Sequence, residues 1–141
     1  MASIEAVYGS VTAVSVTGLA TLANGSSATS EAIDNTSNRF LDALLEVEVA
    51  TASGATATGY IEIHIKGSVD GVDFDDDNND KWAGTINLVT AGAATRRRIV
   101  SIASSFGGAM PPYWRLRVRN ASGAAFTTAS VGYRGVKAQA A

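Results

Sequence analysis

A strict alternation of apolar and polar residues over residues 60–66 constrains the fold more than any other feature of this sequence. Successive side chains of a strand point to opposite faces of a sheet, so β-branched residues at every second position predict a strand with one buried face. Gly67 then interrupts the run, and Asp70-Gly71 supplies a turn. The alternating residues are Ile61, Ile63 and Ile65 on one face, with Glu62, His64 and Lys66 on the other.

Two more segments have the same period of two, over residues 39–51 and 113–120. In the first, the apolar face is Leu45, Val47 and Val49, and the polar face is Glu46 and Glu48. In the second, Trp114, Leu116 and Val118 alternate with Arg115, Arg117 and Arg119. Shorter strands are expected at residues 8–22 (one or two edge strands), 26–33, 82–89, 96–103 and 126–136, the 96–103 strand burying Ile99 with Val100 and Ile102.

Roughly eight strands separated by turns, without a sustained helical period, predict an all-β fold: an antiparallel β-sandwich or jelly roll. The chain of 141 residues is expected to form one domain, 1–141, with termini that extend from it at about 1–10 and 137–141. Small-residue connections are expected at 52–59 and 91–94.

Composition excludes several classes of function. Cysteine is absent, so thiolate metal sites and disulfides are excluded. Charged residues make up 17% of the chain and the net charge is −2, which argues against a nucleic-acid binder. The start of the chain lacks the pattern of a signal peptide, and no apolar run reaches the roughly 20 residues that span a bilayer. We therefore expect a soluble protein without nucleic-acid or membrane partners.

The acidic stretch 70–80 is the sharpest local anomaly. Asp73, Asp75 and Asp77 have the spacing of the first ligands of a calcium loop. The pattern then departs, because Asn78 stands where that loop needs glycine and Gly84 where it needs glutamate. The alternatives are a solvated acidic turn and an electrostatic contact with a neighbouring subunit. The candidate interface residues of this stretch are Asp70, Asp76 and Asp80.

Arginines gather on two expected strands, at 96–98 and at 115, 117 and 119. The second group is expected to pair across strands with Glu46, Glu48 or Glu62. Binding of nucleic acid would need unpaired arginines beside stacking aromatics, and the alternation places Trp114 in the core instead. A charge-complementary protein interface is the better functional alternative, with Arg96, Arg97 and Arg98 as candidates.

No residue set specifies a reaction or a cofactor. His64 is the single histidine, and no nucleophile signature lies near it, so we expect a surface or interface residue rather than a catalytic base. Three segments match the N-glycosylation pattern, at Asn24, Asn35 and Asn120, and are interpreted as turns. The chain is expected not to be an enzyme.

Four segments resemble small β-sandwich structural proteins of tailed bacteriophages: residues 65–74, 112–123, 32–44 and 105–108. The resemblance implies a non-enzymatic virion component, foremost a capsid decoration or cement protein, with a neck, collar or tail protein as the alternative. It also implies other virion proteins as partners, either the major capsid protein or neck and tail proteins. Localisation in the virion and a homo-oligomer follow in the same way.

The Gly-Ser-x-Asp-Gly-x-x-Phe segment at 67–74 and the Tyr-x-Arg-Leu segment at 113–116 also resemble discoidin-like sandwiches that bind carbohydrate or lipid. Members of that group are usually secreted and often carry a disulfide, whereas this chain has no cysteine. This alternative predicts exposed aromatic residues that gather at one end of the sandwich. The candidates are Tyr60, Phe74, Trp82 and Tyr113.

Overall fold

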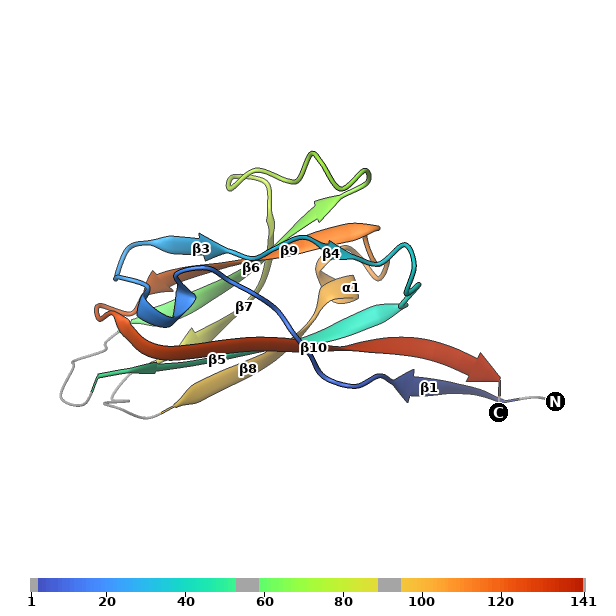
Figure 1. The fold of residues 1–141 in the computed structure, drawn as a ribbon, viewed down its shortest axis with the longest axis horizontal. Helices are drawn as coiled ribbons and strands as arrows, with labels where there is room; N and C mark the ends of the chain where they lie inside the picture. Colours follow the sequence, from blue (N-terminus) through green and yellow to red (C-terminus); the bar gives the residue numbers. More distant parts are fainter. Residues whose placement is uncertain (1–2, 53–58, 89–94, 141) are drawn as a thin grey trace.

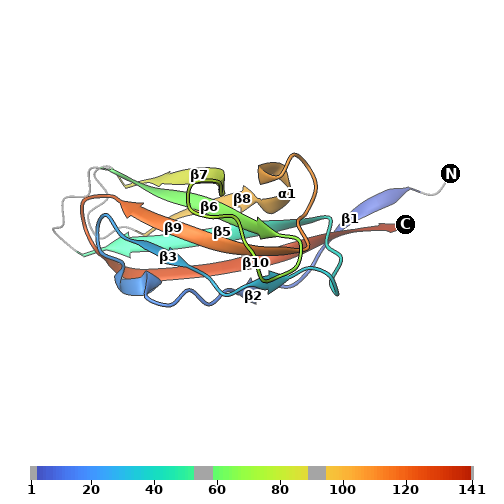
Figure 2. The same cartoon turned by 90° about the horizontal axis from the view of Figure 1, so that it is seen from above.

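The computed structural model describes residues 3–52, 59–88 and 95–140. Two antiparallel sheets pack face to face (Figure 1), and the connections run at the two ends of the sandwich (Figure 2). The elements are β1 (Ile4–Tyr8), β2 (Thr12–Ala13), the 3₁₀ helix η1 (Leu19–Thr21), β3 (Ser27–Thr29), β4 (Ile33–Asp34), β5 (Asp42–Thr51), β6 (Tyr60–Ser68), β7 (Lys81–Asn87), β8 (Arg96–Ser101), α1 (Ile102–Ser105), β9 (Tyr113–Ala121) and β10 (Phe126–Ala140).

We name the two layers sheet A and sheet B. Sheet A has the order β1-β10-β5-β8, with β2 also pairing with β10. Sheet B has the order β3-β9-β6-β7, with β4 also pairing with β9. All of the strand pairings described are antiparallel.

The core lies between the sheets and is built by the alternating segments. Their apolar residues are at most 1% exposed: Leu45, Val47, Val49, Ile61, Ile63, Ile65, Trp114, Leu116 and Val118. Trp114 of sheet B meets Tyr133 of sheet A edge-to-face, with 5.4 Å between ring centroids, so the two layers interlock through aromatic contact. The expected fold class, an antiparallel β-sandwich, is confirmed.

The segment 96–103 differs from the expectation. Val100 and Ile102 are buried, but Ile99 lies on the outer face of sheet A opposite Glu46. The strand ends at Ser101, whose hydroxyl caps the single helical turn of α1 by accepting from the Ser104 N–H. Asp42 fixes this turn by accepting from the Ser101 hydroxyl at 2.7 Å and from the Ala103 N–H at 2.9 Å. Ile102 is therefore buried from a helix rather than from a strand.

The extended termini pair with each other. β1 runs antiparallel to residues 136–140, at the end of β10, and this pair projects beyond the sandwich (Figures 1 and 2). The expected final strand, 126–136, is thus too short, because residues 137–140 continue it as the partner of β1. The expected connections fall largely on residues 53–58 and 91–94, which lie outside the described residues. Within the described residues, no helix has the length and apolarity needed to cross a bilayer.

Candidate functional site

The connection between β6 and β7, residues 69–80, folds back over the outer face of sheet B, and we call it the acidic loop (Figure 1). The loop was expected to be a solvated turn or an electrostatic contact with a neighbouring subunit, and it instead covers outward side chains of β6 and β9. Lys66 on β6 and Arg117 on β9 are each only 7% exposed, although both point away from the core. Charged groups that lose water in this way need close counter-charges.

Asp80 supplies the central counter-charge. Its side chain is 2% exposed, and it accepts two hydrogen bonds from Arg117: Nε to Oδ2 at 2.6 Å and Nη2 to Oδ1 at 3.1 Å. This bidentate geometry is the strongest form of the arginine–carboxylate pair. Hydrogen bonding of the Arg117 guanidinium to the Asp80 carboxylate is the main reason that the pKa of Arg117 is raised. Asp80, expected as an interface residue, is therefore buried inside the molecule.

Lys66 forms the second tie between the sheet and the loop. Its ammonium group donates to the Asp75 carbonyl at 3.0 Å and to Asp77 Oδ1 at 2.5 Å. Asp75 in turn accepts from the Gly67 N–H at 2.9 Å. The hydrogen bond from Lys66 is the main reason that the pKa of Asp77 lies below its ordinary value. Together with Asp80, these contacts hold both ends of the 75–80 segment against the sheet.

His64 lies under the edge of the same loop. Its ring nitrogens are 3.2 Å from Glu62 Oε2 and 3.1 Å from Asp80 Oδ1, and its side chain is 12% exposed. Trp82 meets the imidazole edge-to-face at 5.3 Å. Glu62 also pairs with Arg119 at 3.3 Å across the strands, which is one of the expected cross-strand contacts. The histidine is thus part of a buried ionic network rather than a free surface residue.

The tip of the acidic loop presents two valines and several carboxylates to solvent. Val69 is 84% exposed and Val72 is 78% exposed. Asp70 accepts from the N–H groups of Val72 and Asp73, and these hydrogen bonds lower the pKa of Asp70. Asp76 accepts similarly from Asn78 and Asn79. The tip is a set of Asx turns with fixed backbone.

The structure does not bring Asp73, Asp75 and Asp77 together as a calcium site. Asp75 points to the Gly67 amide and Asp77 to the Lys66 ammonium. Within the described residues, no group of three His, Cys, Asp or Glu side chains could hold a metal ion. The physical reason is that groups of the sheet, the Gly67 N–H and the Lys66 ammonium, each bind one of these carboxylates and hold them apart.

Acid should loosen the loop. The pKa values of Asp70 and Asp77 are lowered in the folded chain from 3.8, so between those values and 3.8 the unfolded chain binds more protons. The ionised carboxylates of Asp70 and Asp77 therefore stabilise the folded chain fully above about pH 4, and this stabilisation is lost as the pH falls through their pKa values in the folded chain. We expect the free energy of unfolding to fall below about pH 4, and Asp77→Asn to flatten that fall. Urea unfolding at a series of pH values from 2 to 7 measures the free energy of unfolding. If it falls as steeply with pH in Asp77→Asn as in the wild type, Asp77 does not contribute to the acid sensitivity.

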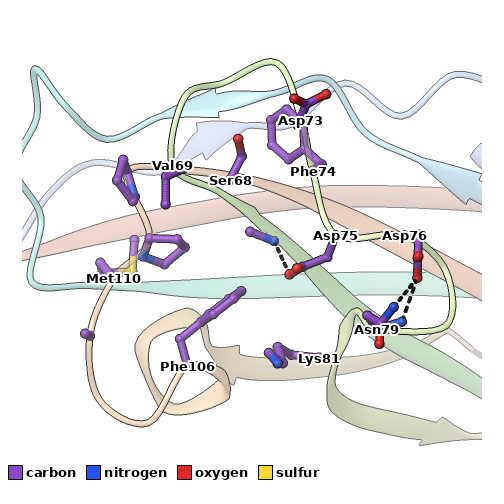
Figure 3. A pocket seen from close by; sticks show the side chains of 14 residues that line it. Ser68, Val69, Asp73, Phe74, Asp75, Asp76, Asn79, Lys81, Phe106 and Met110 are labelled. Carbon is purple, nitrogen blue, oxygen red and sulfur yellow. Dashed lines mark hydrogen bonds between the residues drawn. The ribbon is translucent and has the colours of Figure 1, made fainter.

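A cleft of about 750 Å³ opens between the acidic loop and the 106–112 connection (Figure 3). Its apolar lining comes from Val69, Phe74, Phe106 and Met110. Its polar lining includes Asp76, Asn79 and Lys81. A few polar groups around an apolar surface are typical of small-ligand sites, and the volume is in their usual range of roughly 300–1,000 Å³.

Contacts below the cleft fix both of its aromatic rings. Arg115 lies 4.2 Å from the centroid of the Phe74 ring in a cation–π contact. Phe106 packs on Gly67, where a Cβ atom would meet its ring at 2.6 Å. A glycine at this position of β6 is thus required for the ring to lie there. Arg115 therefore supports the cleft, and within the part of the chain that the structure describes it forms no ion pair with the expected glutamates.

Arg96, Arg97 and Arg98 lie on β8, at the edge of sheet A. Arg97 pairs with Glu48 on β5 at 3.1 Å, on the exposed outer face. Arg98 donates to the Thr85 carbonyl of β7 at 3.3 Å and so links the two sheets. Arg98 therefore lies beside the strand that follows the acidic loop, but among the described residues no ion pair joins the arginines of β8 to the loop.

Three of the four aromatic residues proposed for carbohydrate binding lie at the acidic-loop end of sheet B, and only Tyr60 lies at the other end. Tyr60 pairs with Ala121 at one end of β6, whereas Tyr113 pairs with Ser68 at the other. Phe74 lines the cleft, and Trp82 contacts His64 edge-to-face. Sequence reasoning missed Phe106, Met110 and Lys81 as lining residues, since nothing in the sequence signals that their connections meet.

Comparisons with known proteins give no family. No family model matches the chain, and no curated protein matches it. Among solved structures, the chain is similar to the CBM35 from Cellvibrio japonicus Abf62, at 15% identity and a TM-score of 0.45, over 84% of this chain and 72% of that chain.

Proposed function

We propose that this chain is a non-enzymatic structural component of a tailed-phage virion, foremost a capsid decoration or cement protein. A neck, collar or tail position is the alternative. The observation that carries the proposal is the acidic loop, whose 75–80 segment is held by Lys66 and Arg117 while Val69 and Val72 stay exposed. The resemblance of residues 65–74 and 112–123 to phage sandwich proteins supports the same reading.

A fixed loop suits a lattice protein for a physical reason. Ordering a mobile loop on binding costs about 0.5–1.5 kcal/mol for each immobilised side chain, and a loop already held avoids most of that cost. The exposed Val69 and Val72 provide apolar contact, and the surrounding carboxylates favour a basic partner surface. Many copies on one particle then add weak contacts by avidity.

The test is to measure the chain in purified particles of a phage that encodes it, by mass spectrometry and cryo-electron microscopy. A copy number close to that of the major capsid protein supports decoration, and a few copies per particle support the neck or tail. Absence from particles would refute the proposal.

The loop is tested separately by adding purified protein to particles that lack it. We expect Val72→Asp to weaken attachment at least about tenfold, because it removes apolar contact at the tip. Thr128→Asp, which adds the same charge at an exposed position of β10 away from the loop, is the matched control and should attach normally. Equal attachment of both variants would mean that another surface binds the particle.

A second function, carbohydrate binding, is favoured by the cleft, where Phe74 and Phe106 lie beside Asn79 and Lys81. Sugars stack on aromatic rings and exchange hydrogen bonds with such polar groups. A glycan array with the wild type, Phe106→Ala and Trp82→Ala tests it. Binding lost in Phe106→Ala alone places the sugar in the cleft, and loss in Trp82→Ala alone places it over His64. No binding by the wild type would end this candidate.

A further inference from the structure

The pair formed by β1 and residues 136–140, which we call the terminal ribbon, has two chemically different faces. Directly opposed residues of an antiparallel pair lie on the same face, and the faces alternate along the strands. One face carries Glu5, Val7, Lys137 and Gln139. The other is wholly apolar and carries Ile4, Ala6, Tyr8, Val136, Ala138 and Ala140.

The apolar face of the ribbon is open to solvent. Ile4 is 78% exposed and Tyr8 is 57% exposed, and every residue of β1 is exposed. An isolated two-stranded ribbon is at best marginally stable in water, and an apolar face of this kind needs cover. The ribbon extends past the sandwich (Figures 1 and 2), so its own sheets do not provide that cover.

The same surface continues onto the outer face of sheet A. Val131 and Tyr133 of β10 point into the core, so Gly132, Arg134 and Val136 point outwards with the apolar face of the ribbon. A groove of about 380 Å³ lies on this outer face, with Gly132 at its floor. Val11, which is 62% exposed, and Ile99, which is 59% exposed, form its walls.

We propose that this surface is a self-association face, on which the ribbon of one copy covers the groove of a second copy. The ribbon and the groove lie on the same face of the molecule. A two-fold axis that runs in the plane of this face, between ribbon and groove, therefore places the ribbon of each copy over the groove of the other copy. The contact joins the apolar side chains of Ile4 and Tyr8 to the walls formed by Val11 and Ile99. It stands independently of the virion proposal and leaves the acidic loop free on the opposite sheet.

The charges of this face favour a second copy over an acidic or basic partner. A two-fold interface opposes a surface to itself, so its charges must balance. The outer face carries three carboxylates, Asp42, Glu46 and Glu48, and two arginines, Arg97 and Arg134. Glu48 is paired with Arg97 and Asp42 accepts hydrogen bonds from Ser101 and Ala103, which leaves Glu46 and Arg134 as one charge of each sign. The apolar face of the ribbon has no charge to bury.

The size of the contact predicts its strength. A standard protein interface uses about 20–30 residues a side. The apolar ribbon face and the groove lining together supply somewhat fewer than that from each copy. We therefore expect a dimer that dissociates on dilution in the micromolar range, rather than an obligate one.

Sedimentation equilibrium of the full chain over a concentration series tests the proposal. We expect a monomer–dimer equilibrium whose dissociation constant rises at least about tenfold in Tyr8→Lys and in Ile99→Lys. Gln139→Lys, which adds the same charge to the other face of the ribbon, is the matched control and should leave the constant within about twofold. Circular dichroism confirms that each variant is folded.

Cross-linking tests the reciprocal arrangement without relying on those charge variants. The chain has no cysteine, so Tyr8→Cys and Ile99→Cys each introduce a single thiol. A short bismaleimide should cross-link the mixture of the two variants into dimers much faster than either variant alone. A wild type that stays monomeric at all concentrations, or a dimer that both lysine variants leave intact, would overturn the proposal. Equally fast cross-linking of each variant alone would also overturn it.

Discussion

Replacing Asp80 with alanine should lower the free energy of unfolding by about 3–5 kcal/mol, the usual cost of removing one partner of a buried ion pair. The Asp80 side chain is 2% exposed and lies within 4.0 Å of three side chains of the sheet face: Arg117, His64 and Lys66. Its loss leaves the Arg117 guanidinium buried without its bidentate partner. Urea unfolding followed by tryptophan fluorescence measures the change.

The structure also predicts an asymmetry between the two partners. Arg117→Met removes one of the three groups around Asp80, which keeps Lys66 and His64 nearby, so it should cost clearly less than Asp80→Ala. Asp73→Ala, on the exposed part of the same loop, is the control and should change stability by no more than about 0.5 kcal/mol. A cost below about 1 kcal/mol for Asp80→Ala would mean that water reaches this face and that the loop is not held as described.

Alternation in the sequence was sufficient to predict the fold class. In β5, β6 and β9 apolar residues occupy every second position, so only one of the two faces of each strand can supply the core. That face is the buried one in the structure. In β8 the run Ile99-Val100 offers apolar residues in both phases. The choice there was made by pairing with β5, which sets Val100 opposite the buried Leu45 and sends Ile99 outwards.

The ionic network was harder to predict, because most of its pairs depend on how the acidic loop folds rather than on the pairing of strands. The pair of Arg119 with Glu62 follows from strand pairing and was predicted. The pair of Arg117 with Asp80 joins residues 37 positions apart and depends on how the acidic loop folds back. A run of aspartates by itself indicates a solvated turn, and only the third dimension shows which carboxylate is buried.

A turn asparagine shows the same limit. Asn120 was interpreted from the sequence as part of a turn, yet it is completely buried. Its amide group donates to the Leu22 carbonyl at 2.9 Å and to the Ala124 carbonyl at 2.8 Å. Its carbonyl oxygen accepts from the Ser122 N–H at 3.0 Å and from the Ser122 hydroxyl at 2.6 Å. One side chain thus joins the η1 region to the β9–β10 turn.

Asn120→Ala should therefore cost at least about 3 kcal/mol, since an unsatisfied buried polar group costs about 1–3 kcal/mol and the variant leaves several of them. Asn24→Ala is the matched control: Asn24 accepts one exposed hydrogen bond from the Gly123 N–H at 2.8 Å, across the same turn. Its loss should cost no more than about 1 kcal/mol, because water replaces an exposed partner. Urea unfolding of both variants compares them directly. Equal losses of stability in the two variants would contradict the claim that the buried hydrogen bonds of Asn120 stabilise the fold more than the exposed one of Asn24.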